Sequence, residues 1–115
     1  MDNFRSEQSA GAAVRCFLCG GAQFPAPHHI ISRQRCRNNP EAWKLVDDTY
    51  RALLVVTLCQ PCHANAHNRE MIRALLKKQI ELGFTPDYVE GVLDEIANTS
   101  IKGTLDDLRW ERLMD

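Results

Sequence analysis

The sequence predicts a small α+β protein with a zinc knuckle, short strands and a helical extension at its C-terminal end. Three observations support this fold class. Two Cys-x-x-Cys pairs stand far apart in the chain, β-branched stretches lie between them, and apolar residues at helical spacing fill the region that follows. With 115 residues, the chain is expected to form one domain with a modest core, to which a bound metal would add stability.

The composition is that of an ordinary globular protein, with 44% apolar and 25% charged residues. No apolar run approaches the roughly 18 residues that cross a membrane, so we expect no membrane partner. The opening MDNFRSEQSAGAAVR is polar and lacks the apolar stretch of a secretory signal, which predicts a cytoplasmic location. In that reducing compartment, paired cysteines are expected to be metal thiolates rather than disulfides.

The net charge of −1 is unevenly distributed along the chain. Residues 1–75 carry nine Lys/Arg and six Asp/Glu, whereas residues 76–115 carry five and nine. So low a total charge predicts weak non-specific DNA binding, because phosphate neutralisation supplies most of that affinity. The basic cluster of Arg33, Arg35 and Arg37 is the expected phosphate-binding segment, and the alternative is a merely solvated loop.

The N-terminal part is expected to begin with a flexible arm at residues 1–13. A Cys-x-x-Cys knuckle follows, in which Gly20 and Gly21 suit the left-handed backbone that a thiolate loop requires. The stretch HHII after two prolines predicts a short strand, and EAWKL predicts one helical turn. The apolar, β-branched run at residues 52–58 is the strongest strand prediction.

Helices are predicted for the rest of the chain. Apolar residues at helical spacing predict one helix over residues 61–82, with Pro61 in its first turn and Gly83 at its end. A second helix is predicted to begin at Thr85, a capping residue followed by proline, and a third, short one near Thr104.

The chain thus divides into a zinc module at residues 14–83 and a helical extension at residues 84–115. We expect the extension to pack on the module, with Trp110 and Leu113 as anchors. The alternative is that this acidic segment contacts a protein partner or a second copy of the chain.

Four of the five cysteines form the two Cys-x-x-Cys pairs. Two such pairs let four sulfur atoms converge at about 2.3 Å on one tetrahedral ion, which predicts a structural zinc. Ordinary buried cysteines or a redox pair are the alternatives, and the pairing at both sites argues against them. Cys36 lies in the arginine-rich loop and is expected to be a free thiol. The predicted zinc ligands are Cys16, Cys19, Cys59 and Cys62.

The four histidines form two pairs of their own. His63 and His67 are four residues apart on the predicted helix, so their imidazoles share one face and can hold one ion at roughly 2.1 Å. His28 and His29 are neighbours on the predicted strand, where side chains alternate, so one can face that ion and the other can act on a nearby water. The plainer interpretation is a solvated helix face for the first pair and a surface turn for the second.

The order of these motifs resembles that of the HNH endonucleases, which have the ββα-metal (His-Me finger) fold. The matching features are CxxC, HHII, an apolar strand and LCxxCHxxxH, and they cover about residues 14–70. By this resemblance, His28 binds the catalytic metal together with His63 and His67, and His29 is the general base that activates water. The four cysteines carry over as ligands of a structural zinc, a known elaboration of the family.

The resemblance implies a metal-dependent enzyme that hydrolyses or nicks DNA and contacts it mainly through the phosphate backbone. The catalytic divalent ion would be magnesium, manganese, nickel or zinc, and three imidazoles favour the transition metals over magnesium. Such an ion polarises the phosphate and stabilises the leaving oxygen.

One residue of the family pattern is missing. The asparagine expected five residues before the third cysteine is replaced by Leu54. Either another residue braces the loop between the strands and activity is intact, or the chain is a non-catalytic zinc-binding module that contacts DNA or protein on a degenerate HNH scaffold. The presence of all four histidines favours the first interpretation. A third class is a phage or mobile-element accessory protein whose extension docks on a larger assembly.

Overall fold

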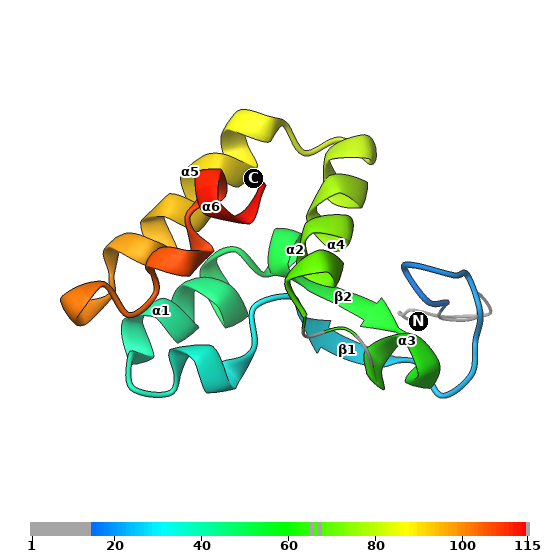
Figure 1. Cartoon of the computed structure of the whole chain (residues 1–115). Coiled ribbons are helices and arrows are strands. Elements are labelled where there is room, and N and C mark those ends of the chain that lie inside the picture. The colour runs from blue at the N-terminus through cyan, green and yellow to red at the C-terminus, as the bar shows by residue number, and fades with distance from the viewer. Residues whose placement is uncertain (1–14, 65, 67, 115) are drawn as a thin grey trace.

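The structure, a computed structural model, describes residues 15–64, 66 and 68–114 and shows a two-stranded antiparallel sheet toward one end of the molecule, with most of the helices to one side of it (Figure 1). The principal extents are 46 × 27 × 26 Å. The prediction of a small α+β protein is confirmed. The predicted arm at residues 1–13 lies outside the described residues. Within the described part, no helix is long and apolar enough to cross a membrane.

The sheet pairs β1 (Ala26–His29) with β2 (Val55–Leu58), and His28 lies opposite Val56. A long segment connects the two strands along the chain. Its elements are a 3-10 turn (Arg33–Cys36), α1 (Pro40–Lys44), a π-helical turn (Leu45–Thr49) and α2 (Arg51–Leu54). The helical turn expected at EAWKL is therefore present as α1.

The first strand is shifted relative to the prediction at HHII, since β1 begins at Ala26 and ends at His29, and the second strand is shorter than predicted. The run at residues 52–58 becomes extended only at Val55, because α2 takes up its first residues. Leu53 and Leu54 are both fully buried. In a strand, consecutive side chains point to opposite faces, so a helical turn is what lets two adjacent leucines enter one core. Ile30 and Ile31 are also fully buried, and they lie in a bend directly after β1 rather than in the strand.

The prediction of a single helix over residues 61–82 is wrong. The structure has two helices there, α3 (Gln60–Ala64) and α4 (Arg69–Glu81). Asn68 separates them with an extended backbone, and its side chain accepts a hydrogen bond of 2.8 Å from the N–H of Met71. An asparagine that caps a new helix satisfies a free backbone donor and therefore favours the break.

The C-terminal extension begins as predicted, with α5 (Pro86–Asn98) capped by Thr85, whose hydroxyl accepts from the N–H of Tyr88 at 3.1 Å. Beyond α5 the chain differs from the single short helix predicted near Thr104. It forms 3-10 turns at Ile101–Gly103 and Asp106–Leu108 and then α6 (Trp110–Leu113).

One apolar core joins the extension to the rest of the described chain. Leu113 is buried and Trp110 packs against this core, in the anchoring role predicted for them. Asn39, which caps α1, also donates to the carbonyl of Thr99 just after α5 at 3.0 Å. Fully buried core residues from both parts include Ile31, Leu54, Leu75, Leu93, Ile96 and Leu108.

The buried side chain of Gln79 holds the end of α2 to α4, because its amide donates to the carbonyl of Leu53 at 2.8 Å. Replacing Gln79 with alanine removes this donor and leaves a small cavity. We expect the free energy of unfolding to fall by about 2 kcal/mol, measured by urea titration. Lys77→Ala, on an exposed position of the same helix, is the control. Equal effects of the two changes would contradict the role of Gln79.

Candidate metal centre and histidine site

Four cysteines from two distant segments are arranged to hold a metal ion. Their sulfur atoms all lie within 4.8 Å of one another, and the Sγ atoms of Cys19 and Cys59 are 3.5 Å apart. In a tetrahedral zinc site with Zn–S bonds of about 2.3 Å, the sulfur atoms are about 3.8 Å apart. The cluster therefore has the size of such a site, and the ligands are the predicted Cys16, Cys19, Cys59 and Cys62.

The first knuckle is shaped by its glycines. Gly20 has a φ of +76°, a left-handed conformation that glycine adopts without strain. The N–H groups of Leu18 and Gly21 point at the sulfur atoms of Cys16 and Cys19, each at 3.4 Å. A side chain at Gly21 would place its Cβ 3.3 Å from the Cys19 sulfur. Backbone donors aimed at sulfur favour the thiolate form that binds a metal.

The second knuckle joins the sheet to α3. Cys59 directly follows β2, and its carbonyl accepts a hydrogen bond of 2.8 Å from the N–H of His63 in α3. The two knuckles are held together through Phe17, whose N–H donates to the carbonyl of Thr57 at 2.7 Å. Lys78 of α4 donates to the carbonyl of Phe17 and lies 5.2 Å from the centre of its ring. The cluster thus connects the N-terminal segment with β2, α3 and α4.

The thiols of the cluster have very different proton affinities. Burial raises the pKa of Cys16, but backbone N–H donors, chiefly those of Cys19 and Cys59, outweigh it and lower this pKa to about 6. Burial and three neighbouring thiols raise the pKa of Cys62 to about 12. Adjacent sulfurs cannot all ionise because like charges repel. A divalent cation between them removes this repulsion, which is why the cluster suits a metal.

Cys36 stands apart from the cluster, as the sequence predicts. It lies in the 3-10 turn and is 2% exposed. Burial raises the pKa of its thiol. A buried thiol that holds its proton behaves as a small apolar side chain.

Two of the predicted catalytic-metal ligands, one on β1 and one on α3, have their rings in contact. His28 on β1 is 1% exposed, and its ring centre lies 4.9 Å from that of His63 on α3, with the rings nearly perpendicular. Two imidazoles that bind one ion at about 2.1 Å have ring centres roughly 4.5–5.2 Å apart. The pair therefore fits a shared ion, and the same geometry also fits an edge-to-face ring contact.

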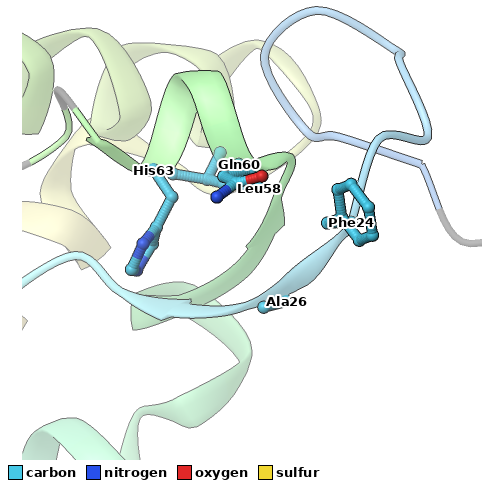
Figure 2. A pocket seen from close by; sticks show the side chains of 5 residues that line it. All are labelled: Phe24, Ala26, Leu58, Gln60 and His63. Carbon is cyan, nitrogen blue, oxygen red and sulfur yellow. The ribbon is translucent and has the colours of Figure 1, made fainter.

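His63 also lines an open pocket of about 420 Å³ beside the sheet (Figure 2). Its side chain extends from α3 toward β1, while Phe24 lies in the loop that precedes β1. Phe24 is 74% exposed. The pocket gives solvent and small ligands access to the imidazole of His63. Its lining residues are Phe24, Ala26, Leu58, Gln60 and His63.

His67, the third predicted ligand, lies outside the described residues. The helix that carries His63, α3, ends at Ala64, and α4 begins at Arg69, so the predicted pairing of His63 with His67 stays a prediction. Among residues 15–64, 66 and 68–114, the cysteine cluster is the one group of three or more ligand side chains close enough for an ion.

His29 makes its contacts away from the His28–His63 pair. Its Nε2 is 2.8 Å from Oδ1 of Asp47, and its ring lies 4.7 Å from that of Trp43. Neighbouring strand residues point to opposite faces, which explains why His28 and His29 have different partners. The predicted general base is thus held by a carboxylate and an aromatic ring.

Asp47 is the functional candidate that the sequence did not reveal. It also accepts a hydrogen bond from Arg51 at 3.1 Å. The hydrogen bond with His29, assisted by the charge of Arg51, holds the pKa of Asp47 below its ordinary value. Asp47 and Asp48 are adjacent and chemically identical, so only the fold distinguishes them. The π-helical turn at Leu45–Thr49 supplied no recognisable sequence signal, although such turns often accompany functional sites.

Leu54, at the position where the HNH pattern has an asparagine, is apolar and fully buried, so it brings no polar side chain to the site. Its backbone carbonyl accepts a hydrogen bond of 2.8 Å from the N–H of Ile30. The start of β2 is therefore tied to the end of β1 by the main chain.

The three arginines lie on or next to the 3-10 turn, which Ser32 caps by accepting from the N–H of Arg35 at 3.3 Å. All three arginines are exposed, and Arg35 also forms an ion pair with Asp107 of the C-terminal extension. Arg35, one of the three arginines predicted to contact phosphate, is thus paired with a carboxylate of the same chain.

Comparisons with known proteins found no family model, no curated protein and no solved structure that matches the chain.

Proposed function

We propose that the chain is a metal-dependent endonuclease of the HNH type, which hydrolyses or nicks phosphodiester bonds of DNA. The observation that carries this proposal is the contact between His28 of β1 and His63 of α3, at 4.9 Å between ring centres, immediately beside a four-cysteine cluster. A strand pair followed by a short helix that carries both cysteine and histidine ligands supports a ββα-metal core. The four cysteines would hold a structural zinc.

The histidines have separate roles in this proposal. His28 and His63, with His67, would hold a divalent ion, and this set of imidazoles suits manganese, nickel or zinc better than magnesium. The ion would supply charge stabilisation for the phosphoryl and leaving oxygens. His29 would accept the proton of the attacking water, a role for which imidazole is suited near neutral pH.

The contact between His29 and Asp47 indicates which ring nitrogen of His29 would accept the proton of the attacking water. A carboxylate bonded to Nε2 favours the tautomer in which Nε2 carries the proton. The lone pair of Nδ1 then remains available to take a proton from water. Asp47 and the ring of Trp43 together fix the orientation of the imidazole.

Nicking of supercoiled plasmid tests the function. Wild-type protein in magnesium, manganese or nickel is expected to nick, and His29→Ala, prepared with equal zinc content, is expected to be slower by about 10²–10⁴-fold. Metal analysis is expected to find two ions per chain when the second metal is supplied, and one in His28→Ala. Absence of nicking with every ion, by folded and zinc-loaded protein, would overturn the proposal.

The second candidate is a non-catalytic zinc-binding module that contacts DNA or protein. The fully buried Leu54 at the asparagine position favours it, because the side chain that braces the family's site is absent. One metal per chain, DNA binding and no cleavage would establish this candidate. A docking role of a mobile-element accessory protein would instead be shown by a defined partner bound to the extension and lost on its truncation.

A further inference from the structure

Two adjoining depressions flank the 3-10 turn that carries the arginines. The first, of about 520 Å³, is lined by Ser32, Gln34, Arg35 and Arg37. The second, of about 450 Å³, shares Gln34, Arg35 and Arg37 and extends to the turns that follow α5. There it is also lined by Asn38, Lys102 and Thr104. We call the two depressions together the arginine–lysine groove.

The groove is positively charged, although the C-terminal part of the chain that forms one side of it is acidic overall. Arg35, Arg37 and Lys102 line it, and no carboxylate is among its lining residues in the described part of the chain. The other polar lining groups are amides and hydroxyls, which can donate hydrogen bonds. Residues 76–115 carry more acids than bases, yet the fold places Lys102 beside the arginines. A concave surface of cations and neutral donors suits phosphate oxygens.

The position of Lys102 is fixed by its backbone. Its φ of +63° is uncommon for a residue with a side chain, and Gly103 follows with a φ of +70°. A Cβ on Gly103 would lie 2.7 Å from a carboxylate oxygen of Asp106, so this turn fits closely against the next one. The hydrogen bonds from Asn39 to Thr99 hold the same region to the start of α1.

Asp107 stands at the edge of the groove and pairs with Arg35. The side chains are 36% and 56% exposed, so the pair is a surface ion pair of small net strength. A phosphate that approaches Arg35 competes with this carboxylate. Asp107 is therefore expected to lower the affinity of the groove for an anion without preventing its binding.

We propose that the arginine–lysine groove binds the phosphate backbone of DNA, with Lys102 as a direct contact, and that Asp107 limits the affinity by holding Arg35. The inference rests on the proposed function only in naming DNA as the polyanion. It adds the C-terminal extension, through Lys102 and Asp107, to the DNA-binding surface.

Binding of a fluorescently labelled duplex to the full zinc-loaded chain, followed by anisotropy without a catalytic metal, tests the inference. Lys102→Asn removes the charge and keeps a residue that tolerates the left-handed backbone. We expect affinity to fall about 3–10-fold and the slope of log affinity against log salt to decrease by about 0.9. Lys77→Gln, on an exposed part of α4 outside the groove, is the charge-matched control.

Asp107→Asn is expected to act in the opposite direction and raise affinity about 2–5-fold, because Arg35 becomes available to phosphate. Glu90→Gln, exposed on α5, controls for the change in net charge. The inference is overturned if the wild type does not bind, or if either groove variant behaves like its control. Groove-dependent binding without nicking would reject the nuclease alone, whereas nicking with unchanged binding in the variants would reject the groove alone.

Discussion

Cys16→Ala is expected to abolish zinc binding and to unfold the metal module, whereas Cys36→Ala is expected to leave both intact. The two cysteines are similarly buried, at 4% and 2% exposure, and differ in that Cys16 belongs to the four-sulfur cluster. Structural zinc contributes on the order of 10 kcal/mol to folding, comparable with the roughly 5–15 kcal/mol of a whole domain. Loss of Cys36 removes one buried sulfur, and we expect a loss of about 1 kcal/mol.

Metal content by elemental analysis and thermal unfolding by circular dichroism measure the two effects. Wild-type protein treated with a strong chelator should reproduce the spectrum of Cys16→Ala, and added zinc should restore only the wild type. The structural role of the metal would be contradicted by a Cys16→Ala protein that is as stable as Cys36→Ala. Because Cys62 and His63 are adjacent, loss of zinc is also expected to displace His63, the candidate ligand of the second metal.

Asp47→Ala is expected to lower the rate of nicking by about 10–100-fold with little change in DNA affinity, because the imidazole of His29 loses the carboxylate that orients it. Asp47→Asn keeps an oxygen that can accept from Nε2 and is expected to recover part of the rate. A role in orientation therefore predicts an effect on kcat and not on KM. Both parameters come from nicking rates at several plasmid concentrations.

Asp48→Asn is the matched control, since Asp48 is the exposed neighbour of Asp47 in the same turn. Nitrogen NMR of the His29 ring provides an independent measurement, because its shifts distinguish the two tautomers. Nicking by Asp47→Ala at the wild-type rate, with an unchanged tautomer, would show that His29 does not depend on this carboxylate. Failure of the wild type to nick would instead reject the nuclease itself.

The parts of the fold that the sequence predicted are those coded by a few consecutive residues. Thr85 and the proline after it cap a helix through contacts within one turn. Gly83 ends α4 with a φ of +132°, and Gly20 turns the first knuckle, because glycine tolerates backbone angles that other residues avoid. The spacing of the two cysteine pairs likewise identified all four members of the cluster.

The incorrect predictions concern segments whose conformation depends on distant partners. The apolar run before β2 has the composition of a strand, yet its first part is helical because adjacent leucines share one core and Gln79 of α4 binds a carbonyl there. The predicted helix over residues 61–82 is interrupted where Ala66 is fully buried and Asn68 caps α4. Hydrophobic periodicity identified α4 but did not reveal this break.

The sequence by itself determined which residues are candidate metal ligands, since two Cys-x-x-Cys pairs and two histidine pairs are visible as spacings. Only the tertiary structure decided how they are combined. It places His28 against His63, joins His29 to Asp47 across 18 positions and brings Lys102 to the arginines. Local spacing fixes the geometry of ligands within a turn or a knuckle, whereas contacts between distant segments depend on how the apolar faces pack in the shared core.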